Sequence, residues 1–174
     1  MAEAGFSERL LELHLDGVYR YAFRLTQDAD AAADLTQETM LRAWRRRTSL
    51  RDAAAAKVWL LRIADNAWND TLRRKLRLRK HEEPAEQESA DPRPPATGGV
   101  EHQETLNRAL AALDALPDRQ RRVMHLAVCE SLPQAEVAEV LGITTQAVKA
   151  SLAAGRKRLR EQLQDIDQQL QTKR

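Results

Sequence analysis

The stretch PQAEVAEVLGITTQAVKASL, residues 133–152, decides the fold of the C-terminal half of the chain. A helix-turn-helix needs a small residue where its helices approach, a glycine that accepts positive φ in the turn, and apolar residues between the helices. Ala138 and Gly142 fill the first two roles, and Val148 packs the second helix onto the first. The remaining apolar residues of this core are Val137, Leu141 and Ile143. The stretch therefore predicts a helix-turn-helix; the alternative is a helical hairpin with the same small and apolar residues by chance.

The second helix of this motif carries the basic stretch TTQAVKASLAAGRKRLR, residues 144–160, which has five basic and no acidic residues. The N-terminal end of such a helix usually enters the major groove of DNA. The side chains expected to contact DNA are Thr144, Thr145, Gln146, Lys149, Arg156 and Arg158. Gln146 can pair with adenine, whereas Lys149 suits phosphate or guanine. Small side chains fill most of the remaining positions, so we expect few phosphate contacts and a shallow salt dependence.

A proline-rich, acidic segment divides the 174 residues into two parts. HEEPAEQESADPRPPATGG, residues 81–99, contains four of the six prolines and almost nothing apolar, which is typical of an unfolded linker. All seven aromatic residues precede it, so the two parts must build different cores. Neither part shows the alternating pattern of strands, and both are rich in helix-forming residues. The sequence predicts an all-α chain with domains at 1–80 and 104–174 and a flexible linker at 81–103.

In the first domain, polar residues mark the starts of three predicted helices. Ser7 can cap the first, and Asp28 or Asp30 can cap a second that reaches Arg47. A third runs from the alanines at 53–56 through Lys80. The expected apolar stripe of the first helix consists of Leu11, Leu15, Val18, Ala22 and Leu25. The third helix is expected to turn Trp59, Ile63 and Ala67 inward.

The net charge of +2 hides blocks of opposite sign. Residues 1–41 hold three arginines against eight acids, residues 42–80 hold thirteen basic residues against three acids, and residues 81–104 hold seven acids against one arginine. Such blocks indicate one basic surface for a polyanion and other surfaces for different partners, although solvated helix faces also produce them. Tryptophans stand among the arginines, and exposed rings can stack on unpaired bases. We interpret Trp59 and Trp68 as core residues.

Three segments together resemble a known family. DADAAADLTQETMLRAWRR is similar to region 2.2 of the extracytoplasmic-function (ECF) sigma factors, the two-domain branch of the bacterial sigma-70 family. WLLRIADNAWNDTLRRKLR is similar to regions 2.3 and 2.4 of that family, and residues 116–160 resemble its region 4. The matches follow the family's order and are separated by a linker of the family's character. The family pattern has arginine near Ser151 and at Ala154, which this chain lacks. Gly155 replaces a common alanine, at a helical cost of about 1 kcal/mol.

The resemblance implies partners and roles for particular residues. Region 2.2 of the family binds a basic coiled-coil of the largest polymerase subunit, which here assigns Asp34, Gln37 and Glu38 to core binding. By themselves these residues favour an ordinary exposed polar face, and only the motif reverses that interpretation. The resemblance assigns promoter DNA contacts in the first domain to Asn66, Asp70, Arg73, Arg74 and Arg77. The loop at residues 48–57 would capture an unpaired base of the minus-10 element, and region 4 would read the minus-35 element.

The implied function is that of an RNA polymerase sigma factor, with core RNA polymerase (beta-prime and beta subunits), promoter DNA and an anti-sigma factor as partners. The linker acids would occupy the RNA exit path, or reflect ordinary disorder. The alternatives are a stand-alone helix-turn-helix regulator that binds duplex DNA without polymerase, and a scaffold or anti-sigma-type protein that binds only protein.

The composition argues against several other classes of protein. No run of about 18 apolar residues occurs, so membrane insertion is not expected, and the start of the chain shows no secretory signal. A single cysteine, Cys129, fits a reducing cytoplasm. The four histidines have no neighbours at zinc-ligand spacing, and no phosphate-cradling glycine loop is present. We expect no enzymatic activity, no cofactor and no metal.

Overall fold

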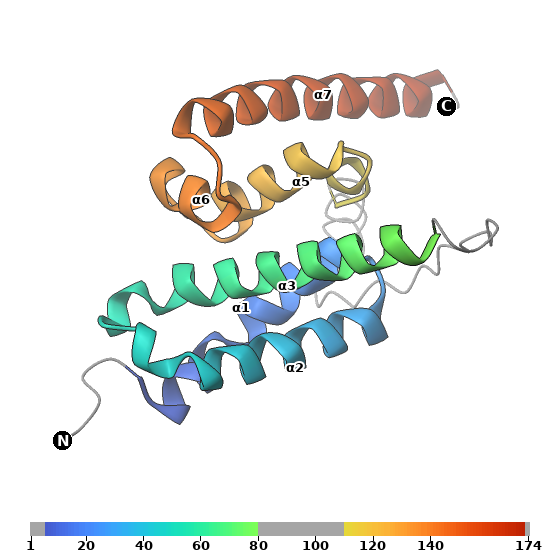
Figure 1. The fold of residues 1–174 in the computed structure, drawn as a ribbon. Helices are drawn as coiled ribbons and strands as arrows, with labels where there is room; N and C mark the ends of the chain where they lie inside the picture. Colours follow the sequence, from blue (N-terminus) through green and yellow to red (C-terminus); the bar gives the residue numbers. More distant parts are fainter. Residues whose placement is uncertain (1–5, 80–109, 173–174) are drawn as a thin grey trace. The chain divides into compact units, whose positions relative to one another are not determined.

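The computed structural model describes residues 6–79 and 110–172, in which the chain forms two compact units (Figure 1). Every regular element in these ranges is helical, which confirms the all-α prediction. The predicted linker at 81–103 and both of its boundaries lie outside the described residues.

The first unit is a bundle of three helices: α1 (Glu8–Thr26), α2 (Ala29–Arg45) and α3 (Ala56–Arg79). Each helix packs against the other two. Inward residues of α3 include Trp59, Ile63 and Ala67, all buried as predicted. Tyr21 of α1 donates a hydrogen bond of 2.7 Å to Asp65 of α3, and both side chains are buried. A buried hydrogen bond thus joins α1 to α3 within the largely apolar core of the bundle.

Side-chain caps fix the starts of the first two helices. The Ser7 hydroxyl accepts a hydrogen bond from the backbone N–H of Leu10 at 3.2 Å, as predicted. Of the two candidate caps for α2, Asp28 is the one used, and it accepts from the N–H of Ala31 at 2.7 Å. Gln27 ends α1 in the left-handed conformation with φ of 55° and leads directly into that cap. The tight connection holds α1 and α2 as an antiparallel pair.

Three expectations about the first unit were wrong in detail. Leu15, placed on the buried stripe of α1, is 43% exposed, because only the C-terminal half of that helix faces the core. The helix α2 ends at Arg45 rather than Arg47. The alanines at 53–55 form a separate 3-10 turn, η2 (Ala53–Ala55), because Asp52 accepts from the N–H of Ala54 and starts a turn there.

The second unit contains α5 (Asp118–Met124), a π-helical turn η3 (His125–Cys129), α6 (Gln134–Leu141) and the long α7 (Thr145–Thr172). In η3 the N–H of Glu130 reaches the carbonyl of His125, five residues back. This wide turn lies between α5 and the loop that leads to α6. Pro117 and Pro133 each stand directly before a helix, where a missing N–H costs nothing.

Gly142 forms the turn between α6 and α7 with φ of 62°, the left-handed conformation that the sequence predicted for it. The N–H of Ile143 then donates to the carbonyl of Ala138 at 3.1 Å and closes the end of α6. Val137, Ala138 and Val148 are buried, in agreement with the predicted helix-turn-helix core.

The close approach of α7 to α5 gives Gly155 a role that the sequence did not predict. A Cβ at this position would lie 3.0 Å from Cγ and 3.3 Å from Sδ of Met124. Gly155 is buried, so its lack of a side chain lets the two helices pack closely. Its helical cost of about 1 kcal/mol is therefore offset by tertiary packing.

Candidate functional site

The basic end of α3 presents four of the predicted DNA-contacting residues together. Asp70, Arg73, Arg74 and Arg77 line one shallow hollow of about 230 Å³. The three arginines are exposed, and they recur at helical spacing, so their guanidinium groups lie on one side of the helix. Asn66 is exposed one turn before Asp70 on the same helix. A hollow lined by three cations is suited to anionic phosphate groups.

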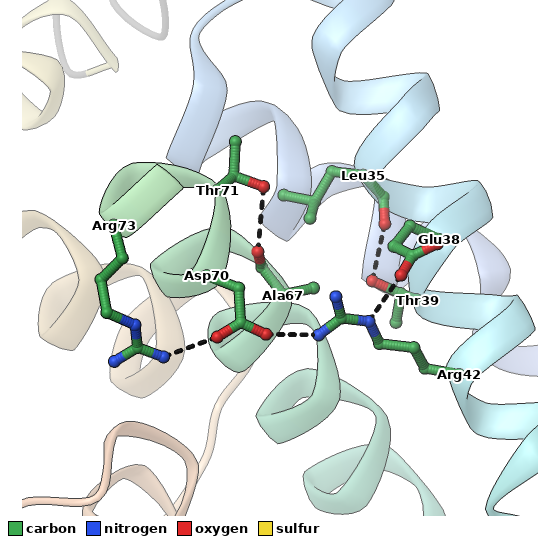
Figure 2. A network of polar contacts seen from close by, with 8 residues as sticks. All are labelled: Leu35, Glu38, Thr39, Arg42, Ala67, Asp70, Thr71 and Arg73. Atoms are coloured by element: carbon green, nitrogen blue, oxygen red, sulfur yellow. Dashed lines mark hydrogen bonds and ion pairs between the residues drawn. The ribbon is translucent and has the colours of Figure 1, made fainter. Parts of the chain in front are cut away.

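An ion-pair network joins this hollow to α2, as Figure 2 shows. Arg42 of α2 donates from Nε to Glu38 at 2.6 Å and from Nη1 to Oδ2 of Asp70 at 2.7 Å. The other oxygen of Asp70 accepts from Arg73 at 2.6 Å. The Arg42 side chain is 20% exposed, whereas that of Arg73 is 61% exposed. Asp70 is therefore bound on one side by the half-buried Arg42 and on the other by the solvated Arg73.

The network shifts the acidity of its members. Hydrogen bonds from Arg42 and then from Arg73 lower the pKa of Asp70, so its carboxylate is stabilised in the charged form. Hydrogen bonds to Asp70 and to Glu38 raise the pKa of Arg42. Both groups stay ionised, and the interaction between α2 and α3 remains electrostatic at any physiological pH.

The three residues assigned to polymerase binding lie together on α2. Asp34 and Gln37 are exposed, and Glu38 is 43% exposed at its side chain. Asp34 and Glu38 line a groove of about 560 Å³ with Arg42, and the wall from α3 includes Trp68, Arg74 and Lys75. Acids of α2 and bases of α3 thus face one groove, which brings the predicted polymerase residues beside the predicted DNA residues.

Sequence reasoning missed Arg42 as part of this site. The signal available was its position four residues after Glu38, the spacing of a helical ion pair. Its second partner, Asp70, is 28 residues away, and nothing in the local sequence indicates that contact.

The connection between α2 and α3, predicted to capture a base, is anchored by a buried tryptophan. It contains η1 (Arg47–Ser49) and η2. Trp59 is 6% exposed and donates from Nε1 to the Ser49 hydroxyl at 3.2 Å. Phe6 contacts Trp59 and Trp44 edge-on, at centroid distances of 6.5 Å and 5.7 Å. As interpreted from the sequence, Trp59 belongs to the core, from which it positions the connection.

Residues predicted to read duplex DNA occupy the start of α7. The Thr144 hydroxyl accepts from the N–H of Ala147 at 3.2 Å, so this residue caps the helix. Thr145, Gln146 and Lys149 are exposed, as are Arg156 and Arg158 further along. Ser151, where the resemblance leads one to expect arginine, is only 8% exposed. The predicted residues of this helix are therefore accessible to a partner.

Two other kinds of site find no support in the described parts of the chain. Across residues 6–79 and 110–172, histidine, cysteine and acidic side chains form no group of three or more that could hold a metal ion. None of the helices in those ranges is both long enough and apolar enough to cross a bilayer.

Comparison with known proteins gives two family matches. The Sigma-70 region 2 family matches residues 10–78, and the Sigma-70, region 4 family matches residues 106–159.

Among curated relatives, the ECF RNA polymerase sigma factor SigL of Mycobacterium tuberculosis is 34% identical and covers 95% of this chain, which spans 93% of SigL. The ECF RNA polymerase sigma factor SigE of Mycolicibacterium smegmatis is 33% identical over 90% of this chain, which spans 61% of SigE.

Among solved structures, the sigma factor RpoE in complex with the anti-sigma factor NepR from Bartonella quintana superposes with a TM-score of 0.78. It has 25% identity and covers 90% of this chain and 96% of RpoE. CnrH, in complex with the cytosolic domain of CnrY, has a TM-score of 0.62 at 23% identity, covering 90% of this chain and 86% of CnrH.

Proposed function

The chain belongs to the ECF branch of the sigma-70 family of RNA polymerase sigma factors, and from this premise we propose how its surfaces share the steps of initiation. As a sigma factor it binds core RNA polymerase and directs transcription from particular promoters. The observation that carries the residue assignments is the groove in which acids of α2 face the cationic end of α3.

Polymerase binding is proposed for Asp34, Gln37 and Glu38. Their exposure leaves carboxylate and amide groups accessible to a partner. A basic coiled-coil of the beta-prime subunit has the complementary charge, which favours encounter and fixes the register of docking. The beta subunit would hold the second domain.

Promoter opening is proposed for α3 and the connection before it. Arg73, Arg74 and Arg77 would hold phosphates of the minus-10 element, and Asn66 would lie near its bases. The connection at 48–57 would bind an unpaired base. Trp59 would hold this connection in place through its hydrogen bond to Ser49. Phosphate contacts position the protein, and base contacts provide specificity.

Minus-35 recognition is proposed for the start of α7. Gln146 and Lys149 are exposed there and carry groups that can reach base edges in the major groove. Thr144 and Thr145 lie at the helix N-terminus, which favours contact with phosphate. Arg156 and Arg158 would add phosphate contacts further along the helix.

The remaining assignments follow from the family. We propose a region 2 domain at 1–80, a linker at 81–103 and a region 4 domain at 104–174. Two similar solved structures are described with partners, RpoE with an anti-sigma factor and CnrH with the cytosolic domain of CnrY, and we propose that an anti-sigma factor also holds this chain. Sigma factors act as initiation factors, so no enzymatic activity is proposed, and the site of action is the cytoplasm.

The test uses purified chain and bacterial core polymerase in run-off transcription from genomic DNA. Core-dependent initiation at a defined set of promoters is expected. A variant with Asp34→Lys and Glu38→Lys should lose core binding in a pull-down. The matched control, Glu12→Lys with Asp16→Lys, reverses two exposed acids of α1 and should bind core normally. Promoter-specific duplex binding without polymerase would instead indicate a stand-alone regulator, and retained core binding by the α2 variant would refute the assignment.

A further inference from the structure

The carboxylate of Asp70 stands in the hollow that is proposed to receive DNA phosphates. It lines that hollow with Arg73, Arg74 and Arg77, and its Oδ1 holds the Nη2 of Arg73 at 2.6 Å. A negative charge in a phosphate site opposes binding, and the arginine that it holds is less available to DNA. In the free chain, therefore, one of the three cations of the hollow is engaged internally.

Arg42 divides its guanidinium between two carboxylates. Nε donates to Glu38, which is proposed to meet the polymerase, and Nη1 donates to Asp70. An arginine bound to one carboxylate frequently makes two parallel hydrogen bonds to its two oxygens, from Nε and Nη2 or from Nη1 and Nη2. While Glu38 holds Nε, the Nε and Nη2 pair is not open to Asp70, and Asp70 receives a single hydrogen bond from Nη1.

Competition for Oδ1 of Asp70 then favours Arg42 over Arg73. The Arg42 side chain is 20% exposed and that of Arg73 is 61% exposed. Exposed ion pairs are weak because water screens them, whereas partly buried ones are stronger. If Arg42 were released from Glu38, it could take both oxygens of Asp70 and displace the solvated arginine.

We propose that Arg42 is a positioning residue that couples the polymerase face of α2 to the DNA face of α3. A basic side chain of the polymerase pairs with Glu38, and Arg42 turns two neighbouring N–H groups, Nη2 with either Nε or Nη1, to Asp70. Arg73 is then released to a DNA phosphate. The charge of Asp70 is neutralised from the α2 side in the same step. By linkage, DNA binding favours polymerase binding to the same degree. This inference rests on the proposed function, since it uses the assigned roles of Glu38 and Arg73.

The experiment uses the free full-length chain, where no polymerase is present. Glu38→Gln removes the negative charge that retains Arg42 and leaves only a weaker neutral acceptor, so it should shift Arg42 towards the released state. Binding to a fluorescein-labelled duplex of mixed sequence is followed by anisotropy over a series of KCl concentrations. Glu38→Gln should tighten binding about threefold and steepen the salt dependence by about 0.9 in log K against log salt, the value for one phosphate contact.

Asp34→Asn is the matched control, because it removes the same charge from an exposed position one turn earlier on α2 and outside the network. It should change affinity less and leave the slope unaltered. Adding Arg73→Ala to Glu38→Gln should abolish the gain in duplex affinity. Adding Arg74→Ala should lower the affinity, but in that background Glu38→Gln should still bind the duplex more tightly than the chain with the unaltered residue at position 38.

Equal effects of Glu38→Gln and Asp34→Asn, no gain with Glu38→Gln, or a gain that survives Arg73→Ala would each overturn the coupling. None of these results would affect core-dependent transcription by the unaltered chain. Failure of this inference is therefore distinguishable from failure of the proposed function.

Discussion

Arg42 lies 2.7 Å from Asp70, and this ion pair ties α2 to α3 at the end of the bundle where the basic surface begins. The two residues belong to different segments of the family resemblance, and the fold brings them together.

Replacing Asp70 by asparagine should change how stability depends on pH. Because arginines lower the pKa of Asp70 beneath its ordinary 3.8, the carboxylate stabilises the fold above that pH and loses the effect as pH falls below it. The side chain is 40% exposed, so its contribution is under about 1 kcal/mol. Urea unfolding followed by tryptophan fluorescence reports the first unit, which holds all three tryptophans. The unaltered chain should lose stability below about pH 4 more steeply than Asp70→Asn; parallel curves would contradict the assignment.

Removing cations from the hollow on α3 should reduce the salt dependence of promoter binding. For the holoenzyme, log K for promoter DNA falls as log salt rises. Arg74→Ala and Arg77→Ala should each make this negative slope shallower by about 0.9. The loss should be similar at every promoter, because phosphate contacts carry no sequence information. Arg9→Ala, an exposed arginine of α1, serves as the control and should leave the slope unchanged. A promoter-selective loss would mean that these arginines contact bases.

The hydrogen bond between Trp59 and Ser49 should matter for promoter opening and not for polymerase binding. Ser49→Ala and Trp59→Phe each remove one partner of this hydrogen bond. Ser49→Ala should lower the free energy of unfolding by about 1 kcal/mol, and Trp59→Phe by more, because it also shrinks a buried side chain. The two effects should be less than additive in the double variant, because both remove the same bond. Permanganate footprinting of the open complex should show reduced opening, while a core pull-down stays normal. Reduced core binding in Ser49→Ala would place the effect elsewhere.

At the start of α7, Lys149→Ala should weaken transcription more than Ser151→Ala. Lys149 is exposed and Ser151 is 8% exposed, so only the first can contribute a charge to DNA. Lys149→Ala should also make the salt dependence of promoter binding shallower, by the amount expected for the loss of about one phosphate contact. Run-off transcription at several KCl concentrations measures both. Equal effects of the two substitutions would assign minus-35 recognition to another surface.

Filling the contact between α5 and α7 should destabilise the second unit alone. Gly155→Leu must displace Met124, at a cost of about 1–3 kcal/mol. Ala153→Leu places the same side chain at an exposed position of α7 and should change stability by under about 0.5 kcal/mol. Circular dichroism reports helices throughout the chain, whereas tryptophan fluorescence reports the first unit. Only the circular dichroism transition should shift in Gly155→Leu; a shift in both would contradict the placement of the contact.

The sequence predicted those features of the fold that depend on local chemistry. The Ser7 cap, the left-handed Gly142 and the inward face of α3 follow from residue type and helical spacing, and the structure confirms them. Contacts between distant segments could not be predicted in this way. The ion pair of Arg42 with Asp70 and the approach of Gly155 to Met124 depend on how helices pack, which a pattern within one helix does not reveal.

The candidate site shows the same division. Its residues on α2 and α3 were selected by resemblance, and those on α7 by their position in the helix-turn-helix. Most of them are exposed, which leaves them accessible without testing their roles. The internal partners of Glu38 and Asp70 became visible only with side chains in place.

The π turn η3 has a consequence for how the gene can change. A π turn holds one residue more than an α turn, and each helical residue turns the chain by about 100°. Loss of a single codon within His125–Cys129 would convert the turn to α-helix and rotate the segment after it by that angle. The start of α6 would then point in another direction. Along this segment we therefore expect an in-frame deletion to be more damaging than most substitutions.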